Sequence, residues 1–296
     1  MTTRMLPSLF LLAVLAAGVL PAARAAQDYD GCTGFIDSLP AYIDTPGVWC
    51  LRKDLSTSMA SGNAILVVTD NVAIDCNDFK VGGLAAGAAS KADGIAFAGG
   101  VENATVRNCN VRGFYRGISI NGGDGHLVED NRLDNNLHIG INTTAVGAVT
   151  VRRNRVLETG GALENVDNYG IYCDAPSGGA CHIDDNIVNG VSGHSGWYSS
   201  VYGIRVTRTE GGGINGNSVR NLVPSGAGKT AYGLYAGLSE AGYTSLRDNR
   251  MALGAAVAGS IAVACFGSDV TLGGNTSWGF ASGVYSCIDD GGNVAH

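Results

Sequence analysis

One six-residue motif recurs along this chain with one constant and one variable spacer. The motif is apolar-x-x-Asn-x-apolar, as at 128–133 (VEDNRL) and 151–156 (VRRNRV), and it alternates with a Gly-Ile pair, as at Gly140 and Ile141. From that Ile to the next motif the step is 10 to 12 residues, whereas the return step varies from 6 to 15. Such asymmetry indicates a repeating scaffold with loops added along one edge.

The aligned repeats predict short strands rather than helices. The two apolar columns of the motif and the column after Gly are mostly Val and Ile, which favour strands, and turn residues lie between them. Repeats of 20 to 50 residues are typical of solenoids, whose coils bury their apolar columns against the coils above and below. The alignment places Asn77 and Phe79 in the first copy of the motif, and Ser260 and Ile261 in the seventh Gly-Ile slot.

The Asn column has a physical explanation in such a coil. We expect each Asn to adopt a left-handed turn conformation, and its amide to bond the Asn of the next coil in a ladder. Cys109 replaces Asn once, which is consistent with a disulfide at that rung. A leucine-rich repeat shares the phrase L-x-x-N-x-L, but it requires Leu-rich strands and a helical return.

The repeated V-x-x-N-x-V followed by Y-G-I resembles the right-handed parallel β-helix repeat of the pectate-lyase-like superfamily. The stretches at 46–51 (PGVWCL) and 71–75 (NVAID) resemble the entry sequence of those proteins. The resemblance covers roughly residues 45–290. It implies an all-β, right-handed parallel β-helix of about eight coils with an N-terminal cap. The superfamily includes lyases, hydrolases, epimerases, adhesins and non-catalytic binding proteins, so function must be argued from the site.

The N-terminal residues have the pattern of an export signal. Arg4 precedes an apolar run at 9–20, and 23–25 (ARA) forms a small-x-small cleavage site. We therefore predict a signal peptide at 1–26, a cap and entry strand at 27–70, and the β-helix at 71–296. The apolar run is too short for an ordinary membrane span. The expected location is secreted or periplasmic, without membrane insertion.

The charge of the chain limits its partners. Removing the signal peptide leaves 17 basic and 26 acidic residues, a formal charge of −9. A negative surface disfavours nucleic acid as a partner, and disfavours a polyanionic glycan less strongly. We expect a monomer that binds a polysaccharide or oligosaccharide.

The eight cysteines predict four local disulfides in an oxidising compartment. The expected pairs are Cys32 with Cys50, Cys76 with Cys109, Cys173 with Cys181, and Cys265 with Cys287. A zinc site is the alternative, but no pair has Cys-x-x-Cys spacing and histidines are few.

The outward column after the first apolar anchor alternates in sign, which favours an ionic ladder between coils. It contains Asp75, Arg107, Glu129, Arg152, Asp184, Asn215, Arg247 and Gly273. Carboxylates interleaved with arginines make a poor calcium site. Calcium therefore remains a candidate cofactor without an assigned site, and no metal ligands are predicted.

Three long return segments, at 157–169, 189–202 and 220–232, should be neighbours because successive coils stack. Their candidate catalytic residues, with one on the adjoining strand, are Glu164, Asp167, His194, Lys229 and Arg205. The candidate substrate-binding residues are Tyr172, Trp197, Tyr198 and Tyr235. Tyr172 and Tyr235 flank Arg205 as an exposed aromatic pair suited to sugar faces and carboxylates. Tyr169, Tyr202 and Tyr232 each precede the Gly, and we expect them to form a packing stack rather than a site; Trp197 either binds ligand or anchors its own loop.

These features support two functions of different classes. The first is a secreted protein that binds, and in one version cleaves, a polysaccharide as a lyase or glycoside hydrolase. A lyase needs a base, for which His194, Tyr198 and Lys229 are candidates, and a carboxylate neutraliser such as Arg205. The alternative is a non-catalytic periplasmic or surface solenoid that binds ligand or serves a structural role.

Overall fold

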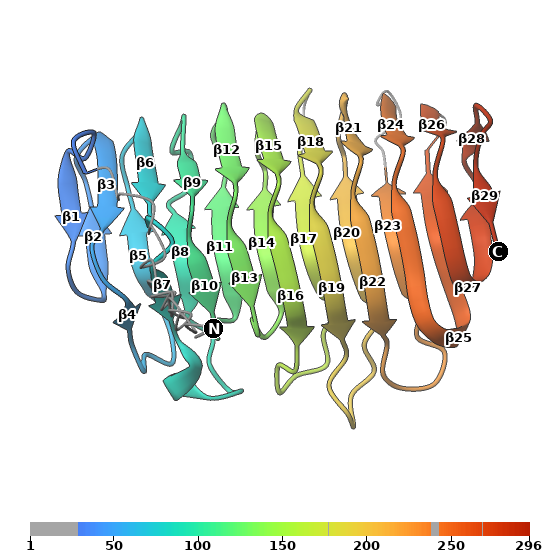
Figure 1. Ribbon diagram of the computed structural model, residues 1–296, viewed down its shortest axis with the longest axis horizontal. Coiled ribbons are helices and arrows are strands. Elements are labelled where there is room, and N and C mark those ends of the chain that lie inside the picture. Colours follow the sequence, from blue (N-terminus) through green and yellow to red (C-terminus); the bar gives the residue numbers. More distant parts are fainter. Residues whose placement is uncertain (1–28, 177, 238–242, 268) are drawn as a thin grey trace, which may run out of the picture.

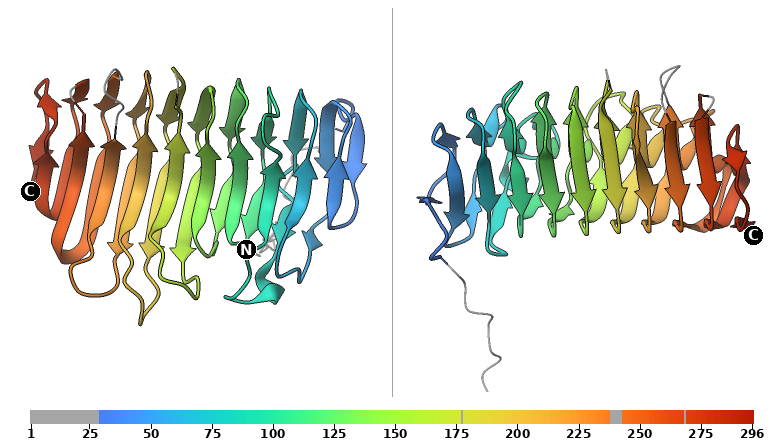
Figure 2. Two further views of the ribbon diagram at one scale, coloured as in Figure 1. Left: turned by 180° about the vertical axis from the view of Figure 1, so that it is seen from behind. Right: turned by 90° about the horizontal axis from the view of Figure 1, so that it is seen from above.

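The chain folds into a right-handed parallel β-helix, seen as a row of stacked coils in a computed structural model (Figure 1). The structure describes residues 29–176, 178–237, 243–267 and 269–296, so the predicted signal peptide lies outside the described residues. The views from behind and from above show that the coils form an elongated body (Figure 2). Every strand-to-strand ladder is parallel, as expected when each coil pairs with its neighbours along one axis.

The first series of strands forms one eleven-stranded sheet and contains the first apolar column of the motif. Its strands are β1 (Gly34–Ile36), β3 (Gly47–Leu51), β6 (Val72–Asp75), β9 (Thr105–Arg107), β12 (His126–Glu129), β15 (Ala148–Arg152), β18 (Ala180–Asp184), β21 (Gly212–Asn215), β24 (Tyr243–Arg247), β26 (Asp269–Gly273) and β28 (Ile288–Asp289).

The second series follows the Asn turn and contains the second apolar column. Its strands are β4 (Leu55–Ser56), β7 (Lys80–Gly82), β10 (Asn110–Arg112), β13 (Arg132–Asp134), β16 (Arg155–Gly160), β19 (Ile187–Ser192), β22 (Ser218–Val223) and β29 (Val294–Ala295). A single 3-10 turn in the described residues, η1 (Leu84–Ala86), follows β7.

The third series contains the Gly-Ile column. Its strands are β2 (Ala41–Ile43), β5 (Asn63–Val67), β8 (Asp93–Phe97), β11 (Arg116–Asn121), β14 (Ile139–Thr144), β17 (Asn168–Asp174), β20 (Val201–Thr207) and β23 (Ala231–Gly237). The long strands β25 (Arg250–Phe266) and β27 (Thr276–Tyr285) continue both the second and the third series.

The predicted Asn ladder is confirmed from Asn131 to Asn275 and continues to Asn293, whereas Asn77 is not part of it and donates to the backbone oxygen of Leu51 at 3.2 Å. Each amide nitrogen donates to the amide oxygen of the next rung at 2.9–3.0 Å, and the last acceptor is Asn293. The predicted left-handed conformation of the ladder Asn is wrong. The residue before it adopts that conformation instead, as Asp130 does at φ 56° and Arg153 at φ 54°. That turn leaves the Asn itself directed into the buried ladder.

The predicted alignment is wrong in two of the coils. In the first, Asn77 and Asp78 both have positive φ and lengthen the turn, so Val81 rather than Phe79 pairs with the second apolar column. In the seventh, Val263 pairs with Leu234, while Ile261 pairs with Tyr232. Ser260 and Ile261 resemble the Gly-Ile pair but lie two residues too early, next to an irregular stretch of β25 in which Gly259 has φ 73°.

The Gly column is explained by close approach between coils. A Cβ on Gly203 would lie 2.6 Å from the backbone oxygen of Gly233 and closer still to a methyl group of Val219. Gly170 and Gly140 have the same environment, facing the next Gly oxygen at 2.6 Å and a Val methyl. In these three coils glycine is therefore required by space rather than by backbone angle, whereas the seventh coil has Ala262 at this slot.

The four predicted disulfides are present, joining Cys32–Cys50, Cys76–Cys109, Cys173–Cys181 and Cys265–Cys287. They leave no free cysteine among the described residues. Four disulfides are consistent with a protein of an oxidising compartment.

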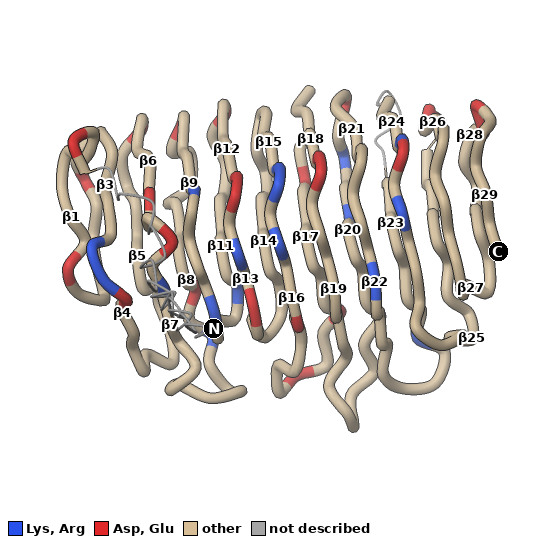
Figure 3. The backbone as a smooth tube through the Cα atoms, viewed as in Figure 1, with Lys and Arg blue, Asp and Glu red and all other residues tan. Residues whose placement is uncertain are grey.

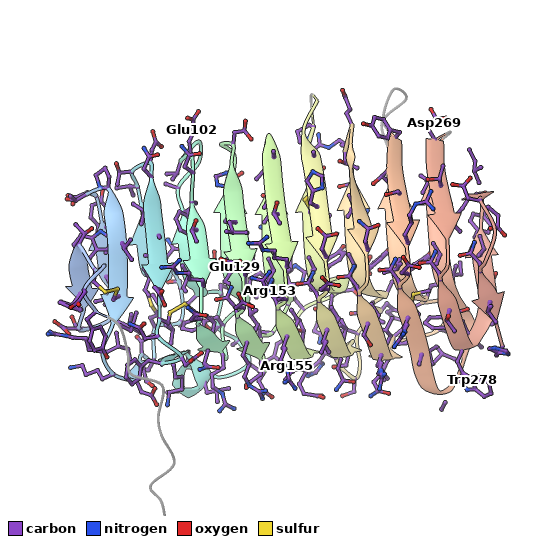
Figure 4. The ribbon with its side chains drawn as sticks, turned by 45° about the horizontal axis from the view of Figure 1, so that its top comes forward. Glu102, Glu129, Arg153, Arg155, Asp269 and Trp278 are labelled. Carbon is purple, nitrogen blue, oxygen red and sulfur yellow. A yellow bond between two sulfur atoms is a disulfide. The ribbon has the colours of Figure 1, made fainter. Side chains whose placement is uncertain are left out.

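The charged column on the first series forms ion pairs between some neighbouring coils. Arg107 bonds Asp75 at 2.7 Å, and Arg152 bonds Glu129 at 2.8 Å. Figure 4 shows Glu129 beside Arg153, which bonds the same carboxylate at 2.7 Å. The charges in this column are therefore used in contacts between coils, as expected.

Candidate functional site

The three long loops lie side by side at one edge of the β-helix, after β16, β19 and β22 (Figure 1). The backbone N–H of Ser200 donates to Asp167 at 2.9 Å, which joins the first loop to the second. Ser199 and Ser225 exchange two backbone hydrogen bonds of 2.9 and 3.0 Å, which join the second loop to the third. The prediction that these loops are neighbours is confirmed, and Figure 3 shows that they contain few charged residues.

A run of aromatic rings follows the third series along the helix axis beside these loops. Consecutive ring centroids are 4.7–5.9 Å apart, which is within the range of favourable aromatic contact. The rings belong to Tyr115, His138, Tyr169, Tyr202, Tyr232, Tyr235, Phe266 and Tyr285. The predicted stack of Tyr169, Tyr202 and Tyr232 is confirmed within this run.

A hollow of ≈ 410 Å³ opens where the loops meet the aromatic run. Its lining contains two of the candidate catalytic residues, Asp167 and Lys229, together with the exposed Tyr198. His138 and Tyr169 of the aromatic run also line it, with Asn165 and Val166. The hollow therefore combines a carboxylate, an ammonium group, a phenol and aromatic faces.

Glu164 lies elsewhere, because its loop reaches back toward the N-terminal coils. Its carboxylate accepts hydrogen bonds from the hydroxyl of Tyr115 and from the ammonium of Lys91, which lies 4.2 Å from the centre of the Tyr115 ring. Burial raises the pKa of Glu164, but the bonds from Lys91 and Tyr115 outweigh it and lower the pKa below the usual value. Glu164 thus fastens the loop and is not among the residues that line the hollow.

His138 lies between the hollow and the contacts that Glu164 makes with Tyr115 and Lys91. Its ring lies 4.7 Å from that of Tyr115, and Nδ1 is 3.3 Å from the amide oxygen of Asn168. Burial lowers the pKa of His138, so the ring is neutral near pH 7. A neutral imidazole facing an open hollow is able to accept a proton.

Arg205 lies in a cluster of four tyrosine rings on the third series. Its guanidinium carbon is 4.9–5.7 Å from the ring centres of Tyr169, Tyr172, Tyr202 and Tyr235. Tyr172, Arg205 and Tyr235 are paired in register on β17, β20 and β23, as the sequence predicts. Both flanking tyrosines are half-buried rather than exposed, because they also contact the rings of the stack.

The remaining loop residues separate into exposed and enclosed side chains. Trp197 and Tyr198 are exposed, and the backbone of Trp197 bonds His194 and Ser225 within and between loops. His194 is half-buried, and its Nδ1 has no hydrogen-bond partner among the described residues. Neither His194 nor Arg205 lines the hollow that contains Asp167 and Lys229.

Sequence reasoning missed Tyr115, His138 and Lys91, which lie in or beside coils with short returns. Tyr115 and His138 each stand two residues before the Gly of the repeat, one residue earlier than the tyrosines of the later coils. An alignment by outward position rather than by loop length would have found them.

No cluster of three or more His, Cys, Asp or Glu residues that could hold a metal occurs in the described parts of the chain.

The residues that carry the repeat also decide the family. The family model described as the right-handed beta helix region matches residues 53–221. The chain belongs to this family. A solved structure, the Dettilon tailspike protein, is similar to the chain at 15% identity with a TM-score of 0.35. The match covers 85% of this chain and 60% of the tailspike chain, so the chain spans less than two thirds of its length.

No curated protein matches the chain significantly. Among the described residues, no helix is long and apolar enough to span a membrane.

Proposed function

We propose that this β-helix protein binds a polysaccharide along the aromatic run of its third strand series. The observation that carries the proposal is the contact of one ring with the next over successive coils, with a hollow formed by the three long loops beside His138 and Tyr169 of the run. The faces of Tyr169, Tyr202 and Tyr232 cover one another. The C–H faces of sugars would therefore pack on the more exposed rings of the run, such as Phe266 and Tyr285, while sugar hydroxyls bond polar groups at the edge. A continuous row of rings suits an extended polymer better than a compact small molecule.

A second hollow on the same series supports an extended binding face. Its volume is ≈ 200 Å³, and it lies over β5, β8, β11 and β14, toward the N-terminal end from the tyrosine cluster. Its polar lining includes Asn63, Asp93, Arg116, Ser119 and Asn121. Arg116 and Asp93 are joined by bonds of 2.7 and 2.8 Å, so this part of the face is polar and ordered.

Binding is tested by measuring glycan affinity for the wild type and for matched tyrosine variants. Tyr235→Ala removes a ring of the run, and Tyr243→Ala removes a ring that is exposed on β24 of the first series. We expect Tyr235→Ala to weaken binding about tenfold or more, as loss of one stacking platform does, and Tyr243→Ala to leave it unchanged. Equal effects of the two substitutions would place the ligand elsewhere. Absence of binding to any glycan of a broad panel would reject the function.

Cleavage of the bound glycan is a second candidate, favoured by the residues of the ≈ 410 Å³ hollow. Asp167 is a candidate acid, and His138, Tyr198 and Lys229 are candidate bases beside the aromatic run. The assay incubates each bound glycan with the protein and follows unsaturated product in the ultraviolet and new reducing ends. Product that disappears in Asp167→Asn or Lys229→Gln supports an enzyme. Binding without product identifies a non-catalytic binding protein.

Export of the protein is part of the proposal. It is supported by the four disulfides, together with the signal pattern at 1–26. Mass spectrometry of the mature protein from its natural host would test it, since a chain that begins near residue 27 is expected.

A further inference from the structure

Arg205 differs from the other half-buried arginines of the described residues. Five arginines are half-buried, and four of them bond a carboxylate of the chain. The pairs are Arg107 with Asp75, Arg112 with Asp134, Arg116 with Asp93, and Arg152 with Glu129. Of these five, Arg205 alone forms no ion pair within the described part of the chain. A partly desolvated charge is costly unless something compensates for it, so this exception needs an explanation.

The tyrosine cluster compensates for the charge of Arg205 only in part. Nη1 donates to the hydroxyl of Tyr169 at 3.1 Å, while Nε is buried without a partner. The four ring faces supply cation–π attraction, with Tyr235 closest at 4.9 Å. A guanidinium has five N–H donors in a fixed fork, and only one of them is matched to an oxygen here. The cluster thus orients the fork but leaves its charge without a counterion.

The neighbours of Arg205 along the axis are uncharged. The outward column of the third series contains Ala96, Ser119, Asn142, Tyr172, Arg205, Tyr235, Ala264 and Tyr285. A polymer lying on this column would meet one cation between two aromatic rings, with neutral groups on either side. No other position of this column has a charged residue, so a charge on every sugar of the polymer would not be matched along it.

From these observations we infer that Arg205 binds an anionic substituent, a carboxylate or a sulfate, on an otherwise neutral heteropolysaccharide. The inference rests on the proposed function and specifies its substrate class. The oxyanion would accept hydrogen bonds from the guanidinium, and the sugars on either side would stack on Tyr172 and Tyr235. Because the column has a single cation and the whole chain carries a formal charge of −7, a polymer charged on every sugar is disfavoured.

The inference is tested by isothermal titration of the wild type at low salt with five probes. These are glucuronoxylan, its carboxyl-reduced form, unsubstituted xylan, a sparsely sulfated xylan and polygalacturonate. We expect each sparsely charged xylan to bind about tenfold or more tightly than the neutral forms, the usual order for a charge-assisted hydrogen bond. The better of the uronate and sulfate probes identifies the anion. Polygalacturonate should bind more weakly than the sparsely charged probes.

Two variants connect this preference to the residue. Arg205→Gln should reduce the preference for charged over neutral xylan to about one, and Arg205→Lys should retain part of it. Arg220→Gln is the matched control, because Arg220 is exposed on β22 and forms no ion pair with any described residue. If Arg205→Gln fails to fold, two measurements still test whether Arg205 binds the anion. These are the preference of Arg205→Lys for charged over neutral xylan, and the affinity of the wild type for the carboxyl-reduced xylan.

The outcomes separate the two proposals. Equal binding of neutral and charged xylans, or an unchanged preference in Arg205→Gln, overturns the Arg205 assignment and leaves polysaccharide binding intact. Tightest binding to polygalacturonate also overturns it. No binding to any of the five probes, followed by none to a broader panel, rejects polysaccharide binding itself and the assignment with it.

Discussion

The side-chain amide of Asn186 donates to the amide oxygen of Asn217 on the next coil at 3.0 Å. Its own oxygen accepts from the backbone N–H and the amide of Asn154, at 2.9 and 3.0 Å. Each rung therefore satisfies polar groups on both neighbouring coils, in a region where Asn186 is fully buried. Buried polar networks of this kind stabilise a structure when every member is bonded.

Removing one rung should destabilise the whole coil. Asn186→Ala leaves the Asn154 amide and backbone N–H without their acceptor, and we expect the free energy of unfolding to fall by about 3 kcal/mol or more. Asn215→Ala is the control, because Asn215 lies at the end of β21 on the next coil, outside the ladder, and its side-chain amide donates one half-buried bond to Asp184. Chemical denaturation measures both. Comparable losses of unfolding free energy in the two variants would show that a ladder Asn contributes no more to stability than an Asn outside the ladder.

The Gly column makes a second prediction about packing. Gly203→Ala would force a methyl group against Val219 and the Gly233 oxygen, and we expect a loss of about 2 kcal/mol or more. Gly31→Ala is the control, because a Cβ there has no atom within 4 Å. Thermal melting of the two variants compares them, and a stable Gly203→Ala would mean that the coils are able to move apart at this slot.

The contacts of Glu164 with Tyr115 and Lys91 should hold the first loop in place without contributing much to the stability of the fold. Tyr115→Phe retains the ring beside His138 but removes the hydroxyl that bonds Glu164. We expect faster hydrogen exchange at 161–167 with little change in melting temperature, because the loop is peripheral to the core. Tyr42→Phe, on exposed Tyr42 of β2, should leave exchange at 161–167 unchanged. Unaltered exchange in Tyr115→Phe would show that the other contacts, such as Lys91 with Glu164 and Ser200 with Asp167, hold the loop without the hydroxyl.

Protonation of His138 should weaken the fold below neutral pH. Burial holds its pKa below the unfolded value of about 6.5, so the unfolded chain binds more protons in this range. The stability contribution is complete above that value and is lost as pH falls through it toward the folded pKa. Unfolding at pH 7.5 and 5.5 should show a loss that is smaller in His138→Phe, which keeps the aromatic ring. The same loss in both would assign it to other groups, such as His126, whose pKa burial also lowers.

The fold was predictable because the repeat places one kind of residue at each inward slot. The Asn ladder and the Val and Ile columns depend on stacking alone, and the disulfide pairs depend on closeness along the chain or between neighbouring coils. The two misaligned coils show where this fails. The first turn has two additional residues that resemble the motif, and in β25 Ser260 and Ile261 imitate the Gly-Ile pair two residues before the slot that Ala262 and Val263 occupy.

The candidate site was predictable only in part, because loops are not constrained by the repeat. Adjacency of the three loops follows from stacking, but the direction of each loop does not. Glu164 reaches toward Lys91 of an earlier coil, and no pattern in the sequence indicates that path. Tyr172, Arg205 and Tyr235 were placed correctly because they lie on strands in register.

Because the rings from Tyr115 to Tyr285 occupy seven successive coils, the aromatic run has a fixed length of roughly 29 Å along the helix axis. A polysaccharide bound along the run would gain affinity with each added sugar until it covers the whole run, and none beyond that length. Selection by chain length would then arise from the number of coils, and adding or deleting a coil would change it without altering any contact.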